Sequence, residues 1–85
     1  MDGFNGQTIT FTIKKEREQE MKHTLTTVYN ALLEKGYTPI DQIVGYLLSE
    51  DPTYITNYNN ARSKITKIDR DDLLKVMVQH YLTTP

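Results

Sequence analysis

Two segments of this chain carry apolar residues over a wider arc than one neighbouring helix can cover. On a helical wheel the arcs span about 240° for residues 70–82 and about 200° for residues 39–49, whereas a helix packed on one side needs little more than ~100°. So short a chain has few other helices to cover them, and we therefore expect a second copy to do so, in a symmetric homodimer. The alternative is a tightly wrapped monomer with single apolar residues exposed. The residues expected in the core or at the dimer interface are Ile43, Val44, Gly45, Leu47, Leu48, Leu73, Leu74, Met77, Val78 and Tyr81.

Size and charge exclude several classes of protein. The 85 residues make one small domain, which buries only about 60–65% of its unfolded surface. There is no cysteine, so neither disulfides nor thiolate metal sites add stability. Ten Lys and Arg against eleven Asp and Glu give a formal charge of −1, which disfavours a function on nucleic acid or an anionic membrane. No apolar run reaches the ~18 residues of a membrane span and no signal-peptide pattern is present, so we expect a cytoplasmic protein.

Local signals predict the first two helices. The first covers residues 14–35 and ends where Gly36 favours a left-handed C′ position. The second covers residues 39–49, with Thr38 as its N-cap and Pro39 at its first position. The first helix has an apolar stripe at helical spacing, formed by Met21, Leu25, Val28 and Leu32.

Two further helices are predicted towards the C-terminus. Pro52 ends the second helix, and a connector at residues 52–57 has room for a short helical turn. A third helix follows at about residues 57–68. Asp69 then caps a fourth at about residues 70–82. The fold class is therefore all-α, a small four-helix domain.

The N-terminus differs in composition from the rest. Residues 1–7 are rich in Gly and Asn, and residues 8–13 alternate polar and apolar as a half-buried strand does. No second strand is evident, so the segment must pair across a dimer, lie against the helices or stay mobile. We expect residues 1–13 to form a flexible or loosely docked arm and residues 14–85 a helical dimerisation domain.

The residues do not indicate an enzyme. His23 lies opposite the apolar stripe and is expected in solvent, whereas His80 lies in the apolar arc and is expected to be partly buried. No nucleophile is placed to pair with either, and there is no glycine-rich phosphate loop. Helix capping explains the acidic cluster more simply than a metal does. We expect no catalytic, cofactor-binding or metal-ligating residue and no cofactor. The acidic cluster is Asp69, Asp71 and Asp72.

A helical nucleic-acid-binding module is the alternative function. The order of the second helix, the connector and the third helix resembles that of a helix-turn-helix. Four basic residues also cluster around the third helix: Arg62, Lys64, Lys67 and Arg70. The wheel scatters these basic residues, however, and the net charge opposes phosphate binding. The connector also exceeds the usual turn of three to four residues.

The threonines of the N-terminal segment suggest a modification site. Thr8, Thr10 and Thr12 precede a run of mixed charge at residues 14–18. A protein kinase needs an accessible threonine in an extended segment, and each phosphate adds about −1.5 to −2 charges. The high β-propensity of threonine explains the same residues without any modification. From the residues alone both interpretations stay open.

Gly45 lies inside the second helix, on its polar side. A glycine there costs about 1 kcal/mol relative to alanine, so we expect a close contact to require it. A neighbouring backbone is the expected contact, either in the same chain or in the other protomer. Replacing Gly45 with Leu is predicted to disrupt assembly.

The pattern GYxPIxQIVGYLLS at residues 36–49, with DPTYI at 51–55 and NNAR at 59–62, resembles the IreB family of small Firmicutes proteins. The resemblance covers nearly the whole chain. It implies a cytoplasmic, non-enzymatic regulator of Gram-positive bacteria, a helical homodimer whose flexible N-terminal arm carries a phosphoacceptor threonine. It also implies phosphorylation by a membrane Ser/Thr kinase, reversal by its phosphatase, and a role in cell-wall stress and cephalosporin resistance.

The family's acceptor pattern, Thr-hydrophobic-basic-Phe, falls on residues 8–11, which makes Thr8 the implied acceptor. Thr10 stands where the family has a basic residue and is a second candidate. A further acceptor upstream of Thr8 is missing, because no Ser or Thr precedes it. Glu50 and Thr56 stand where relatives often have Gly and Pro, at the turn after the second helix and before the third.

Overall fold

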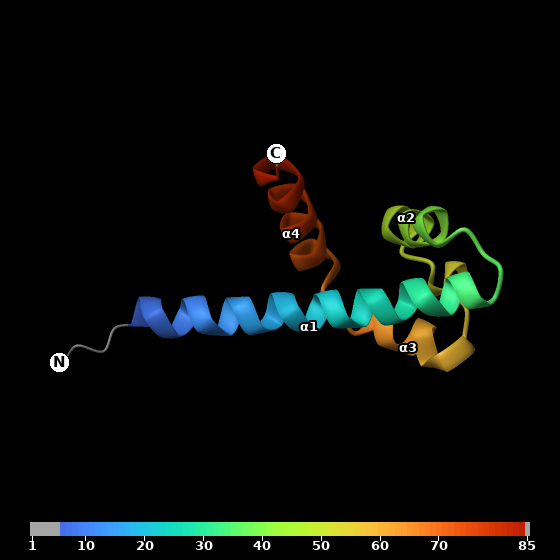
Figure 1. The fold of residues 1–85 in the computed structure, drawn as a ribbon, viewed down its shortest axis with the longest axis horizontal. Coiled ribbons are helices and arrows are strands. Elements are labelled where there is room, and N and C mark those ends of the chain that lie inside the picture. Colours follow the sequence, from blue (N-terminus) through green and yellow to red (C-terminus); the bar gives the residue numbers. More distant parts are fainter. Residues whose placement is uncertain (1–5, 85) are drawn as a thin grey trace.

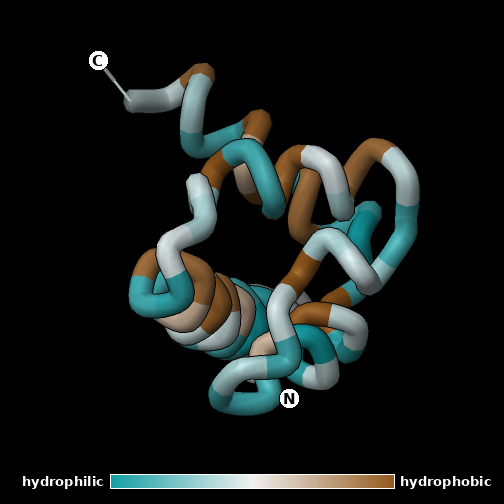
Figure 2. The backbone as a smooth tube through the Cα atoms, turned by 90° about the vertical axis from the view of Figure 1, so that its right-hand side faces the viewer, coloured by the Kyte–Doolittle hydropathy of each residue, from teal (hydrophilic) through white to brown (hydrophobic). Residues whose placement is uncertain are grey.

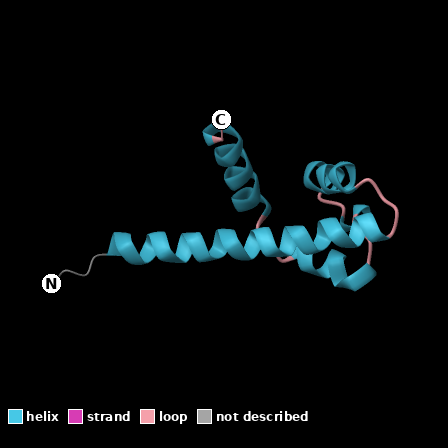
Figure 3. Cartoon of the chain, in the orientation of Figure 1, coloured by secondary structure: helices cyan, strands magenta, loops and turns pink. Residues whose placement is uncertain are grey.

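The computed structural model describes residues 6–84, and for residues 6–13 the backbone only. Across these residues the chain is helical and contains no strand, which confirms the predicted all-α class (Figure 3). Two short 3-10 helices lie between the second and third α-helices. The elements are α1 (Gly6–Glu34), α2 (Pro39–Ser49), η1 (Pro52–Tyr54), η2 (Tyr58–Asn60), α3 (Ala61–Thr66) and α4 (Arg70–Thr83).

Helix α1 is the longest helix, and the other helices lie along it (Figure 1). Helices α2 and α4 lie to one side of it, at separate points along its length, and α3 lies across from them. The helix begins at Gly6, eight residues before the predicted start, so the strand-like alternation of residues 8–13 is helical in the structure. A helix satisfies its own backbone hydrogen bonds, whereas a strand needs a partner strand, and residues 6–84 contain none. The predicted division into an arm and a domain at residue 13 stays a prediction.

The turn between α1 and α2 follows the predicted signals. Gly36 has a φ of 83°, and its N–H donates to the carbonyl of Leu33 while the N–H of Tyr37 donates to that of Leu32. This pair of bonds is a Schellman motif, which needs a residue that tolerates the left-handed conformation. Helix α2 has the predicted bounds, with Thr38 at the N-cap, although the Thr38 side chain makes no capping hydrogen bond.

The segment between α2 and α3 is held by polar contacts around one buried side chain. Ile55 is fully buried, and the Arg62 Nε donates to the carbonyls of Ile55 and Pro52 at 2.9 and 3.1 Å. The third helix begins at Ala61, later than predicted, because Asn59 and its neighbour have positive φ angles of 53° and 60°. Left-handed residues interrupt an α-helix, and asparagine tolerates that conformation better than most side chains.

Helix α4 begins as predicted and ends one residue later. The Asp69 carboxylate accepts hydrogen bonds from the N–H groups of Asp71 and Asp72, at 2.9 and 3.2 Å. The helix then rises steeply from α1 (Figure 1), and Leu73 is its one buried residue. Apolar contact with the rest of the chain therefore fixes only the first turn of α4.

One apolar cluster joins all four helices, and it confirms the stripe predicted on α1. Val28 and Leu32 are completely buried, Met21 nearly so, and Leu25 packs at the edge. Ile65 contributes a fully buried side chain from α3. The buried core comprises Met21, Val28, Ala31, Leu32, Ile43, Leu47, Ile55, Ala61, Ile65 and Leu73.

Candidate protein-interaction surface

An apolar groove lies over α1, between α2 and α4, and we call it the α2–α4 groove. Its volume is about 380 Å³. Apart from the hydroxyl of Tyr29, its polar lining comes from Lys22 and Thr26 on α1. Met77 lines the groove from α4, along which hydrophobic positions recur in Figure 2. The remaining lining residues are Leu25, Tyr29, Ile40, Ile43, Val44 and Leu47.

The residues predicted for the core or the interface divide into two groups. Ile43, Leu47 and Leu73 are buried in the core of the single chain. Six others remain exposed, with Tyr81 at 85% and Leu48 at 81% of their full accessibility, and Gly45 is half-buried. The wide arcs read from the sequence are therefore not covered within one chain. The exposed members are Val44, Leu48, Leu74, Met77, Val78 and Tyr81.

The close contact predicted at Gly45 exists, but its partner is different from the one expected. A Cβ atom built on Gly45 would lie 2.5 Å from Cε1 and 2.6 Å from Cδ1 of the Tyr54 ring. The neighbour is thus an aromatic side chain of the same chain and not a backbone. The Tyr54 carbonyl accepts a 2.8 Å hydrogen bond from Nε2 of Gln42, so the backbone of the loop is also tied to α2.

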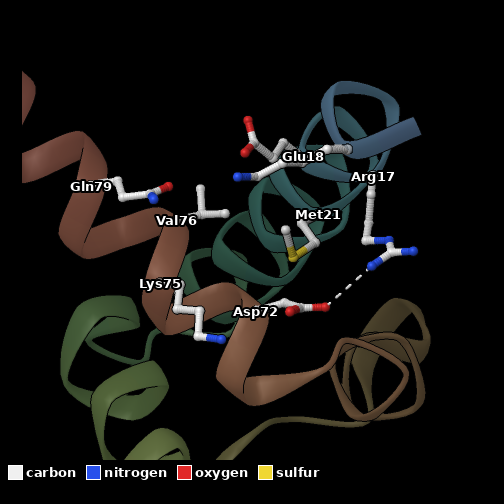
Figure 4. Close-up of a pocket in the computed structure, with 8 residues that line it drawn as sticks. Arg17, Glu18, Met21, Asp72, Lys75, Val76 and Gln79 are labelled. Carbon is white, nitrogen blue, oxygen red and sulfur yellow. Dashed lines mark ion pairs between the residues drawn. The ribbon is translucent and has the colours of Figure 1, made fainter. Parts of the chain in front are cut away.

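The crossing of α1 and α4 has a polar flank (Figure 4). Arg17 Nη1 lies 3.6 Å from Asp72 Oδ2, beside the apolar side chains of Met21 and Val76. Both partners of this ion pair are substantially exposed, and such pairs contribute little to stability. This flank therefore adds a weak orienting contact to α4 and no enclosed site.

Two of the four basic residues near α3 hold the fold together. Arg62 bonds to the loop carbonyls described above, and Arg70 donates from Nη1 to the carbonyl of Leu47. The second Arg70 nitrogen, Nη2, lies 3.1 Å from Oε2 of Glu50. Both guanidinium groups thus bind partners within the chain, and the structure gives no support to the nucleic-acid interpretation.

The titratable residues form no catalytic arrangement in the part of the chain that the structure describes. His23 is exposed as predicted; His80 is exposed too, so the prediction that it is partly buried is wrong. It lines a groove between α1 and α4, and it is exposed because the last turns of α4 bury no residue. Between residues 6 and 84 no His, Cys, Asp or Glu side chains group as metal ligands. Hydrogen bonds from the Thr53 hydroxyl and N–H lower the pKa of the exposed Asp51, which caps η1.

The predicted phosphoacceptors lie near the start of α1. Residues 8 and 10 have helical backbone, and their side chains lie outside the described part of the chain. Sequence reasoning missed Tyr54, Ile55 and Arg70 as structural residues. A tyrosine after the proline turn and an isoleucine in a polar stretch were the available signals, but nothing local indicated their partners.

Comparison with known proteins identifies relatives over most of the chain. The family described as IreB regulatory phosphoprotein matches residues 6–83. A UPF0297 protein of Acetivibrio thermocellus is 54% identical over 78 residues, which cover 92% of this chain and 87% of the relative. A UPF0297 protein of Ruminiclostridium cellulolyticum is 53% identical over 76 residues, which cover 89% and 86%.

No described helix combines the length and apolar character that crossing a membrane requires.

The family match spans α1 to α4, and the long motif that carried the resemblance lies at the α1–α2 turn and in α2. The resemblance read from the sequence is thus confirmed, and the regulatory role in the family's description applies here. The chain belongs to the IreB family of regulatory phosphoproteins.

Proposed function

We propose that this protein is a non-enzymatic cytoplasmic regulator that a membrane Ser/Thr protein kinase phosphorylates at Thr8 or, secondarily, Thr10. It acts by binding other proteins, in signalling that links cell-wall stress to cephalosporin resistance. The family match is the observation that carries this proposal. The exposed apolar surface supports it, because large exposed apolar patches mark binding sites for other proteins.

Phosphate on the N-terminal segment changes the charge of the chain without altering its core. Each modified threonine adds about −1.5 to −2 charges to a chain whose formal charge is −1. Residues 6–13 precede the part of α1 that enters the core at Met21. The added charge therefore acts on a partner, or on the orientation of the segment, and not through repacking.

The direct test is phosphorylation of the full chain by the catalytic domain of a bacterial membrane Ser/Thr kinase, followed by site mapping with mass spectrometry. Phosphate is expected on Thr8, with a smaller amount on Thr10. The variants Thr8→Ala and Thr10→Ala separate the two contributions, and Thr84→Ala is the matched control at the opposite end of the chain. Phosphate confined to the threonines of α1 after residue 13, of α3 or of α4 would refute the assignment.

The homodimer is part of the same proposal. Six of the predicted packing residues are exposed in the single chain, and four of them lie on α4, which has a single buried residue. A second copy that covers the α2–α4 groove would remove this apolar surface from water, at about 25 cal/mol per Å². Symmetric association is the commonest form for such a surface.

Met77 provides the test of the dimer, because it lines the groove and is 39% exposed in one chain. Met77→Glu is expected to weaken dimerisation by about a hundredfold, since an unpaired carboxylate in an apolar interface costs ~3 kcal/mol or more. Ser63→Glu on α3 introduces the same charge on the opposite side of α1 and is the matched control. Sedimentation of the unmodified protein as a 9.9 kDa particle would refute the dimer.

A further inference from the structure

The first two turns of α1 are helical although their residues favour an extended chain. Of the eight residues from 6 to 13, five are the β-branched types Thr and Ile, and one is Gly. These types are less favourable in a helix than Ala, Leu or Lys. The three apolar positions, 9, 11 and 13, follow the period of a strand; in a helix, positions 9 and 13 share one face and position 11 lies on the opposite side. No single helical stripe therefore gathers the apolar residues of these two turns, and burying one face would leave the other apolar side exposed.

The position of these turns in the fold also leaves them with little support. In Figure 1 the start of α1 extends past the point where α4 crosses it. Among the α1 residues whose side chains the structure describes, those from 14 onward, Lys14 and Lys15 line grooves with α4. The first turn contains no acidic residue to interact with the helix dipole. Short helices without tertiary packing are marginal in water, so helical and extended forms of residues 6–13 are close in free energy.

A kinase distinguishes between these two forms. Its substrate cleft binds an extended segment, in which each residue advances about 3.3 Å, whereas a helical residue advances about 1.5 Å. The four steps from Thr8 to Thr12 therefore span about 6 Å in the helix and about 13 Å in the cleft. In the extended form residues 8, 10 and 12 lie on one face, so either Thr8 or Thr10 is presented by a shift of two residues.

We propose that residues 6–13 form a conformational gate on phosphorylation, an inference that rests on the proposed function. Thr8 and Thr10 accept phosphate only in molecules whose first two turns of α1 have unwound. In the transfer step the threonine Oγ1 bonds to the γ-phosphorus of ATP as the bond to the ADP oxygen breaks, and the hydroxyl proton passes to the base of the kinase. The phosphorylation rate then follows the unwound fraction of α1, and a partner that stabilises or unwinds these turns regulates the modification.

Two substitutions at Thr12 test the gate without touching either acceptor. Thr12→Ala and Thr12→Gly remove the same hydroxyl but differ in helix propensity by about 1 kcal/mol, which corresponds to a factor of about five. The full-length Gly variant is expected to incorporate phosphate at Thr8 about five times faster than the Ala variant. Hydrogen exchange of the amides of residues 9–13 is expected to be faster in the Gly variant by a similar factor.

A control separates helix formation from the sequence preference of the kinase. Ile13→Pro breaks the first turns, because proline removes a backbone N–H and clashes with the preceding turn. In that background the Ala and Gly variants at residue 12 should be phosphorylated at equal rates, and faster than in the native background.

Three results would overturn the gate. They are equal phosphorylation rates for the two variants in the native background, a rate difference that persists with Ile13→Pro, and hydrogen exchange that does not respond to residue 12. Each of these leaves the proposed function intact, provided that Thr8 or Thr10 is labelled. The absence of phosphate from both threonines in every variant would instead refute the proposed function itself.

Discussion

The contact between Gly45 and Tyr54 allows a sharp test of the packing of α2. Replacing Gly45 with Ala would place the new Cβ atom 2.5 Å from Cε1 of the ring. Carbon atoms in favourable contact lie about 3.5–4.0 Å apart, so the ring must move by about 1 Å or more. The 2.8 Å bond from Gln42 to the Tyr54 carbonyl holds the backbone in place, and the side chain has to absorb the movement.

Two opposing contributions set the size of the effect. Alanine in the interior of α2 gains about 1 kcal/mol over glycine from helix propensity. Overpacking against a neighbouring side chain typically costs about 1–3 kcal/mol. We expect Gly45→Ala to destabilise the protein by about 1 kcal/mol in the native background. With Tyr54→Ala already present, the same substitution should stabilise it by about 1 kcal/mol.

The assay is urea unfolding of the four proteins of this cycle at one protein concentration, because association changes apparent stability. The predicted coupling between the two sites is about 2 kcal/mol, within the range seen for residues in contact. With a slope of about 1 kcal/mol per molar urea, each step moves the midpoint by about 1 M. If Gly45→Ala has the same sign and size in both backgrounds, the ring does not explain the glycine.

Two further predictions concern the turn after α2. Glu50→Gly should stabilise the protein by about 0.5–1 kcal/mol, because glycine adopts the left-handed conformation of this position (φ 61°) without strain and only an exposed ion pair with Arg70 is lost. Glu50→Ala should destabilise the protein, because it loses the ion pair and keeps the strain. Thermal melts distinguish the two variants. The Asp51 carboxylate has a pKa below its ordinary value of 3.8, because Thr53 donates hydrogen bonds to it. Its contribution to stability is therefore complete above that value and is lost as the pH falls through the lower pKa of the folded state. Acid titration of unfolding should show this loss, and Asp51→Ala should remove it.

Signals within a few residues of each other predicted much of the helix pattern. The ring of Pro39 fixes the backbone φ at the start of α2, Gly36 adopts the left-handed conformation after α1, and the Asp69 carboxylate accepts hydrogen bonds at the start of α4. Each effect is local. The start of the third helix was placed too early, because sequence gave no reason for two successive asparagines to adopt positive φ.

The side chains of the candidate surface were harder to place. The width of the apolar arcs predicted that Val44 and Met77 would lack partners within one chain, and both are exposed. The burial of Ile55 and the position of the Tyr54 ring depend on contacts with distant segments. No local pattern encodes such contacts. The exposure of His80 follows in the same way from the angle at which α4 leaves the body.

Arg70 contributes to that angle. Arg70, at the base of α4, binds both the Leu47 carbonyl and the Glu50 carboxylate at the end of α2, while beyond Leu73 only Val76 is partly buried against the core. A helix of 14 residues is about 21 Å long, so a tilt of about 5° at its base moves its tip by about 2 Å. A small change in the contacts of Arg70 would therefore tilt α4 about its base. The tilt would widen or narrow the α2–α4 groove, where another molecule would bind.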